Sequence, residues 1–159
     1  MCGISGLVNC GDRAVVSRMT NIQAHRGPDD VGLWEKHFPD GTYIGLGNRR
    51  LAIQDLSAAG HMPLSNEDNS VWITFNGEIY NSPLLRSRLE AKGHRFRSRT
   101  DTEVIVHLYE EHGPECLNDL NGMFAFAICD MRERCCQHPV TSRNQMEGSR
   151  KAYQEDGAR

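Results

Sequence analysis

Residues 71–75 read VWITF and residues 123–129 read MFAFAIC. The first run is made of β-branched and aromatic side chains, which favour strands. The second is an uninterrupted apolar run of strand length, which is typical of a strand buried on both faces. The sequence therefore predicts two strands here, the second of them fully buried.

Two helices are predicted between these strands, because each segment has a start signal and a stop signal. The first is capped by Asn81 or Ser82, has a proline at its first position and ends at Gly93. The second is capped by Asp101 or the threonine after it, presents an apolar face and ends at Gly113.

The rest of the ordered chain is predicted to form shorter elements. Strands then outnumber helices, so the expected fold class is α+β or a layered α/β sandwich. These elements are a buried strand over 1–8, an amphipathic helix over 14–24, a loop over 25–32, paired strands over 43–47 and 51–53, a loop over 57–69 and a short strand at Phe96.

The chain has 159 residues, a formal net charge of −3 and a pI near 6.1. This length suits one domain, and the near-neutral balance argues against a nucleic-acid binder, which usually has a basic surface. No apolar run approaches the roughly 20 residues that span a bilayer, and the N-terminus lacks the pattern of a secretory signal. We therefore expect a cytoplasmic protein with neither a nucleic-acid nor a membrane partner.

The composition changes after Asp130. Residues 131–159 contain no Leu, Ile, Phe or Trp. Such a stretch cannot bury enough apolar area to offset its ordering entropy, which is roughly 1–2 kcal/mol per residue for the backbone. We expect a domain over 1–130 and a polar, disordered tail over 131–159. The run CCQH at 135–138 lacks the spacing of a closed metal site, so no metal site is predicted.

Cys2 lies directly after the initiator methionine. Removal of Met1 would leave a thiol and a free α-amino group on one residue. A free α-amine titrates near 7.7–8.0, so the same residue could supply a nucleophile and its general base. The alternative, that a small residue at this position has no catalytic role, stays open at this point.

Other residues offer groups that could bind polar or charged parts of a substrate. Asn76 and Gly77 follow a predicted strand and supply the donors that an oxyanion hole needs, although Asn-Gly is also the strongest hairpin-turn dipeptide. Glu78 adds a carboxylate that can bind an ammonium group. One of the arginines at 49–50 can pair with a carboxylate or form a surface salt bridge. Asp101 either caps its helix or also faces a bound amine.

Six motifs occur together in this chain. In order they read MCGI, RGPDD, RRLAIQDLS, FNGEIYN, TDTEVI and LNGMFAFAI. This set, from Met1 to Asp130, closely resembles the glutamine-hydrolysing domain of asparagine synthetases, a class II glutamine amidotransferase with an N-terminal nucleophile. The resemblance implies hydrolysis of L-glutamine to glutamate and ammonia, on a four-layer α/β/β/α sandwich of the N-terminal-nucleophile hydrolase type. The site residues that it implies are the nucleophile Cys2 with its α-amino group as base, the oxyanion-hole groups Asn76 and Gly77, and the substrate-binding residues Arg50, Leu51, Glu78 and Asp101.

The resemblance stops near Asp130. The family continues there with strands that complete the sandwich and then with a synthetase domain, so the sandwich is expected to be incomplete at its C-terminal end. That domain uses ATP and Mg²⁺ to amidate aspartate. No cofactor is therefore expected in this chain, and its expected partners are L-glutamine and a synthetase domain or subunit. The alternative is a truncated or frame-shifted fragment without enzymatic activity.

Overall fold

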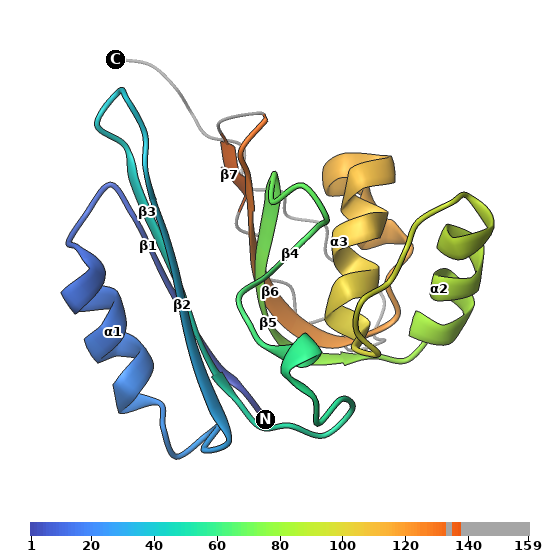
Figure 1. Cartoon of the computed structure of the whole chain (residues 1–159), viewed down its shortest axis with the longest axis horizontal. Helices are drawn as coiled ribbons and strands as arrows, with labels where there is room; N and C mark the ends of the chain where they lie inside the picture. The colour runs from blue at the N-terminus through green and yellow to red at the C-terminus, as the bar shows by residue number, and fades with distance from the viewer. Residues whose placement is uncertain (133–134, 138–159) are drawn as a thin grey trace, which may run out of the picture.

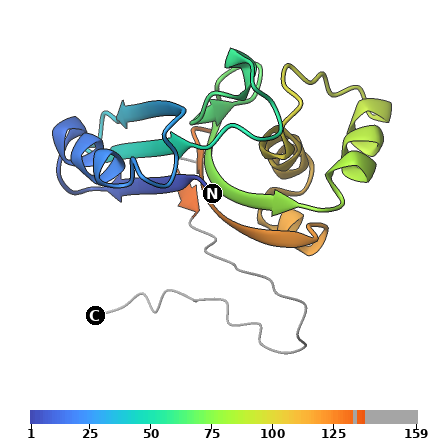
Figure 2. The same cartoon turned by 90° about the horizontal axis from the view of Figure 1, so that it is seen from below.

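The computed structural model describes residues 1–132 and 135–137. Its elements form four layers, which follow one another from left to right in Figure 1. They are helix α1 (Arg13–Ile22), a three-stranded sheet, a four-stranded sheet, and helices α2 (Ser82–Ala91) and α3 (Asp101–His112). Figure 2 shows the same order from below. This is the α/β/β/α sandwich that the resemblance implies, so the predicted fold class is confirmed.

The first sheet has the order β1-β3-β2 and is antiparallel throughout. Its strands are β1 (Gly3–Val8), β2 (Asp30–His37) and β3 (Tyr43–Arg50). Because β1 pairs with β3 in the register Gly3↔Arg49, the start of β1 lies beside the end of β3. Cys2 is therefore carried to the point where the chain leaves β3.

The second sheet has the order β4-β5-β6-β7, also antiparallel. Its strands are β4 (Leu64–Ser65), β5 (Val71–Ile79), β6 (Gly122–Asp130) and β7 (Cys135–Gln137), and two short 3₁₀ helices are η1 (Ala58–Gly60) and η2 (Gly113–Asn118). Strands β5 and β6 pair along their whole lengths. They contain the runs VWITF and MFAFAIC, so both predicted strands are confirmed. The prediction that the second is fully buried is wrong, because the side chains of β6 alternate between its two faces and Met123 is 52% exposed.

The main apolar core lies between the second sheet and α3. Helix α3 is buried without a break from Asp101 to Tyr109, because the sheet and α2 cover it together (Figure 1). A smaller cluster joins the two sheets at the end of β6, where the rings of Trp34 and Trp72 stack with their centroids 5.1 Å apart. The core residues of the main cluster include Ile73, Phe75, Leu89, Val104, Ile105, Leu108, Phe124 and Phe126.

Helix α1 approaches the first sheet at two glycines of β3. A Cβ added at Gly45 would lie 2.6 Å from Cγ2 of Val16, and one added at Gly47 would lie 2.6 Å from Oγ of Ser5 and overlap the hydroxyl of Thr20. No side chain fits at such distances, so the contact between α1 and the first sheet requires glycine at these two positions of β3.

Four local predictions are wrong. The predicted loop over 57–69 contains the short strand β4, because Leu64 and Ser65 pair with Ile73 and Trp72 of β5. Strand β2 begins at Asp30, inside the predicted loop over 25–32, and continues to His37 as a partly exposed edge strand. Residues 51–53 form no strand, because the N–H of Leu51 donates to the Cys2 sulfur and that of Ala52 donates to Asp29. Phe96 forms no strand either; its ring packs edge-on against His107 with centroids 4.7 Å apart.

Part of the predicted tail is folded. Cys135–Gln137 form β7, which pairs with the end of β6 in the register Asp130↔Cys135. The prediction of a disordered tail over 131–159 is therefore wrong at this strand. Residues 133–134 and 138–159 lie outside the described part of the chain, and so does the last residue of the CCQH run. Within the described residues, no helix has the length and apolar character needed to cross a membrane.

Candidate functional site

The Cys2 thiol is held at the backbone of Leu51. The N–H of Leu51 donates to Cys2 Sγ at 3.4 Å, and Sγ lies 3.9 Å from the Leu51 carbonyl oxygen. Arg26, from the RGPDD motif, donates through Nε to the Cys2 carbonyl oxygen at 3.1 Å. Cys2 is half-buried and packs against the main apolar core. The sulfur therefore has a fixed place, although Met1 still precedes it and 72% of the Met1 surface is exposed.

Arg50 is buried at the end of β3 and fixes the loop that follows. Its guanidinium donates to the carbonyl oxygens of Asp55 and Ser57, the latter at 3.3 Å. The Asp55 carboxylate accepts from the N–H groups of Arg99 and Ser57, both at 2.9 Å. The Arg99 bond is the larger cause that holds the pKa of Asp55 at about 2. Two of the five N–H donors of Arg50 are used in these loop contacts.

Asn76 and Gly77 lie inside β5 and form no turn. They pair with Ala125 and Phe124 of β6, so the alternative of a hairpin turn at Asn-Gly is wrong. A Cβ added at Gly77 would lie 2.6 Å from the Phe124 Cα, which explains why a residue without a side chain is needed. The Asn76 amide oxygen Oδ1 is buried and has no hydrogen-bond partner among the described residues. A polar group left in this state is costly unless something else binds there.

Glu78 and Asp101 are connected by a residue that the sequence does not single out. The Gln54 side chain donates through Nε2 to Glu78 Oε1 at 2.7 Å and accepts through Oε1 from the Asp101 N–H at 3.1 Å. Asp101 Oδ2 in turn accepts from the N–H of Ile79 at 2.9 Å. The end of β5, the start of α3 and the loop after β3 therefore meet at one point. The only sequence signal for Gln54 is its place within the RRLAIQDLS motif.

Asp101 is a buried acid. Its burial, with a smaller contribution from the neighbouring charge of Glu78, raises its pKa to about 6, although the hydrogen bond from Ile79 acts in the opposite direction. Asp101 is the first residue of α3 and the cap is Thr100, so the predicted cap lies one residue too late. Near neutral pH the carboxylate is mainly ionised, and it is poised to take a cationic partner.

Hydrogen bonds and chain neighbours thus place the predicted site residues other than Asn76 and Gly77 in two groups, which the loop over 51–57 connects. One holds Cys2 at Leu51, next to Arg50. The other joins Glu78 to Asp101 through Gln54. No hydrogen bond between described residues joins Cys2 to Asn76 or Gly77. A substrate would have to bridge these two groups.

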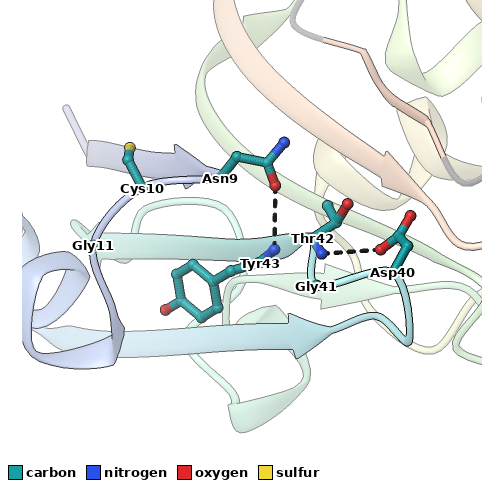
Figure 3. A pocket seen from close by; sticks show the side chains of 7 residues that line it. All are labelled: Asn9, Cys10, Gly11, Asp40, Gly41, Thr42 and Tyr43. Atoms are coloured by element: carbon teal, nitrogen blue, oxygen red, sulfur yellow. Dashed lines mark hydrogen bonds between the residues drawn. The ribbon is translucent and has the colours of Figure 1, made fainter.

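A shallow polar hollow lies at the opposite end of the first sheet (Figure 3). Its walls are held by hydrogen bonds from Tyr43 N to Asn9 Oδ1 and from Thr42 N to Asp40 Oδ1. Asn9 follows the end of β1, whereas Cys2 precedes its start. Because six strand residues extend about 20 Å, this hollow is not part of the Cys2 site.

Comparison with known families bears on these groups. The sequence matches the family described as "Glutamine amidotransferase domain" over residues 1–147. The chain belongs to this family. The predicted family and enzyme class are thereby confirmed, and the family's name identifies glutamine as the amide donor for domains of this type.

The glutamine amidotransferase domain is also similar to curated relatives. It is 46% identical over 139 residues to the glutamine-hydrolyzing asparagine synthetase 2 of Arabidopsis thaliana, covering 84% of this chain and 23% of the relative. It is 38% identical over 137 residues to asparagine synthetase 3 of Bacillus subtilis, covering 82% of this chain and 21% of the relative. The chain therefore spans less than a quarter of these relatives.

A solved structure shares the fold. The glutamine phosphoribosylpyrophosphate amidotransferase of B. subtilis, in complex with ADP and GMP, matches with a TM-score of 0.60 over 80% of this chain and 35% of that chain. The two sequences are 20% identical, so the likeness concerns the fold alone. It supports the four-layer α/β/β/α fold.

Proposed function

We propose that this domain hydrolyses L-glutamine to glutamate and ammonia through a thioester on Cys2. The observation that carries the proposal is the fixed place of the Cys2 sulfur at the Leu51 N–H, in a domain of the glutamine amidotransferase family. Removal of Met1 is required first, since only then is the α-amino group of Cys2 free. The exposure of Met1 makes it accessible to an aminopeptidase.

The chemistry can be followed at each atom. Cys2 Sγ attacks the carbon of the substrate carboxamide while the α-amino group takes the thiol proton. The Asn76 side-chain amide and the Gly77 N–H stabilise the oxyanion that forms. The same proton goes to the leaving nitrogen, and ammonia departs as the tetrahedral intermediate collapses to the γ-glutamyl thioester. Water then attacks the thioester, which releases glutamate and restores the thiol.

Substrate recognition is assigned to the charged groups around the loop after β3. Glutamine is a zwitterion, so a fixed cation and carboxylates placed apart from it suit its two ends. Arg50, positioned next to Leu51, pairs with the α-carboxylate, while Glu78 and Asp101 hold the α-ammonium. The Gln54 amide nitrogen now donates to Glu78 at 2.7 Å. The substrate ammonium therefore displaces it or shares that carboxylate.

The proposed enzyme is longer than this chain. We infer that the domain supplies ammonia to a synthetase domain or subunit that amidates aspartate, as the curated relatives' names suggest. ATP and Mg²⁺ belong to that synthetase part, and no residue of this chain is assigned to them. The motifs end near Asp130, but β7 pairs with β6 and the family match continues to residue 147, so we propose that the domain extends past β7.

The proposal is tested by following glutamate release from glutamine with the purified chain, after mass spectrometry has shown that Met1 is absent. Cys2→Ala is expected to abolish the activity, because it removes the nucleophile. Cys10→Ala, a change at an exposed cysteine near the other end of β1, is the matched control and is expected to retain it. Asn76→Ala should lower kcat by about 10²–10³-fold.

Two outcomes would contradict the proposal. A folded, Met1-processed chain that releases no glutamate would support the alternative of a non-enzymatic fragment. Release that persists in Cys2→Ala would place the nucleophile elsewhere.

A further inference from the structure

Three metal-ligating atoms converge on α3, away from the Cys2 site. His107 and Glu110 lie three residues apart on one face of the helix, and His94 approaches them from the loop between α2 and α3. His94 Nδ1 lies 3.2 Å from His107 Nδ1, and Glu110 Oε2 lies 2.8 Å from His107 Nδ1 and 3.8 Å from His94 Nδ1. None of the three takes part in the proposed glutamine chemistry.

The spacing of these atoms fits a tetrahedral ion. Ligands that each lie 2.0–2.1 Å from Zn²⁺ are about 3.3 Å from one another in tetrahedral geometry, which falls within the three observed separations. A shared proton does not explain the arrangement equally well. His107 Nδ1 faces both His94 Nδ1 and Glu110 Oε2, and a single N–H on it can point directly at only one of them. A cation at the centre would satisfy all three atoms.

The outer polar atoms of the three residues are oriented by neighbours. His94 Nε2 lies 3.0 Å from Glu111 Oε1, and Glu110 Oε1 accepts from the Asn66 amide at 2.7 Å. His107 Nε2 lies 3.9 Å from Glu103 Oε1. Imidazole ligands in metal sites usually direct their second nitrogen toward a carboxylate, which leaves the first as a lone-pair donor. His94 has such a hydrogen-bonded carboxylate in Glu111, whereas His107 Nε2 is buried without a hydrogen-bond partner among the described residues and faces Glu103 from 3.9 Å.

The carboxylates around His107 and the solvent-exposed position of Glu67 also favour a bound cation. Glu67 Oε2 lies 4.0 Å from His107 Nδ1, and the Glu67 side chain is 48% exposed. It can reach the ion as a fourth ligand, or a water can take that position. Oxygens of Glu67, Glu103 and Glu110 lie within 4.0 Å of the His107 ring nitrogens. Negative charge therefore surrounds the place where a cation would bind.

We propose that His94, His107 and Glu110 bind a divalent transition-metal ion, with Zn²⁺ as the ion that their nitrogen and oxygen donors favour. Both histidines ligate through Nδ1, and their remaining ring hydrogens lie on Nε2, toward Glu111 and Glu103. The ion joins the loop before α3 to the second and third turns of that helix. It therefore has a structural role, because it fixes the loop that contains His94 to the helix that begins with Asp101.

The test is titration of the metal-stripped full chain with ZnCl₂ by isothermal calorimetry. We expect one site in the wild type, at least a 10-fold weaker one in His94→Ala, and the same loss in Glu110→Gln, which keeps the shape of the side chain. His112→Ala removes an exposed histidine from the last turn of α3 and is the matched control with unchanged affinity. Circular dichroism checks that each variant is folded.

Two further measurements separate this site from zinc bound by cysteines. Co²⁺ in place of Zn²⁺ should give a visible spectrum without a thiolate charge-transfer band. Zn²⁺ should raise the Tm of the wild type and of His112→Ala but not of His94→Ala. The proposal is overturned if the wild type has no such site, if both ligand variants bind like the wild type, or if the Co²⁺ spectrum shows thiolate ligation.

Discussion

Different interactions stabilise the two halves of the sandwich. The first half consists of α1 and the first sheet, and the second half consists of the second sheet with α2 and α3. In α3 every residue from Asp101 to Tyr109 is buried against the second sheet and α2, whereas α1 buries only Val16 and Thr20. The half that carries Asn76, Glu78 and Asp101 therefore has an extensive apolar core. The half that carries Cys2 relies on the close approach of α1 to the glycines of β3 and on a few polar bonds.

This difference suggests that the second half provides most of the stability, while the first half fixes the position of Cys2. Apolar burial is the dominant stabilising term in folding, so the second half should provide most of the stability. The position of Cys2 depends on individual contacts, such as the bond from Arg26 Nε to the Cys2 carbonyl oxygen at 3.1 Å. Single changes in the first half should therefore disturb the nucleophile at a smaller cost in overall stability.

The largest predicted effect lies in the second half. Phe126 of β6 is 2% exposed within the main core, so Phe126→Ala should lower the free energy of unfolding by about 3–5 kcal/mol. Met123 on the same strand is 52% exposed, and Met123→Ala should change it by less than about 0.5 kcal/mol. Urea unfolding followed by circular dichroism measures both. Similar losses in the two variants would remove the basis of the comparison.

The sequence predicts the second half better than the first. VWITF and MFAFAIC are long apolar runs, and both helices beside them have clear start and stop signals, so local pattern is sufficient there. Strand β2 mixes exposed and partly buried positions, and this leaves no apolar run to detect.

The site is predicted as a set of residues but not as an arrangement. The motifs identify residues such as Arg50, Glu78 and Asp101. The role of Gln54 depends on a loop that is fixed by the side chains of Arg50 and Asp55. Likewise, Asn76-Gly77 avoids a turn because β6, far along the chain, pairs with it. Contacts between distant segments decide such features, and residue type alone does not reveal them.

The second prediction concerns the charge that the apolar half buries. The pKa of Asp101 is raised to about 6 in the folded protein, against 3.8 for the unperturbed group. Its contribution to stability is therefore complete below about pH 4 and is lost as the pH rises through 6. A pKa difference of about two between the folded and unfolded protein corresponds to about 3 kcal/mol in the free energy of unfolding. Asp101→Asn should thus unfold at higher urea than the wild type at pH 8, with the advantage shrinking toward pH 4.

One control and one further measurement sharpen this prediction. Glu90→Gln changes an exposed acid on α2 and should leave the pH profile of stability unchanged. Parallel profiles for Asp101→Asn and the wild type would contradict the prediction. If the proposed glutamine site is correct, the KM of the wild type should also rise as the pH falls below 6, because protonated Asp101 no longer attracts an ammonium group.

The third prediction tests the close approach in the first half. Gly47→Ala would bring a methyl group against the hydroxyls of Ser5 and Thr20 and should cost about 1–3 kcal/mol. At Gly6, on the neighbouring strand, the nearest atom to an added Cβ is 3.4 Å away, so Gly6→Ala is the matched control. Equal thermal stability of the two variants would show that α1 adjusts freely and that the contact does not constrain the first half.

The smallest predicted effect concerns one polar bond in that same contact. Thr20 Oγ1 donates to the Val16 carbonyl oxygen at 2.8 Å, so at the 2.7 Å contact between hydroxyls the proton comes from Ser5. Both groups are buried. A bond of this kind contributes about 0.5–1.5 kcal/mol, and a double-mutant cycle with Ser5→Ala and Thr20→Val isolates it. A coupling near 1 kcal/mol would mean that α1 is fixed by this polar contact as well as by steric fit. Additive effects would mean that the two hydroxyls do not stabilise each other. The close packing of α1 on the glycines of β3 would then be what fixes α1 against the first sheet, which contains the strand that follows Cys2.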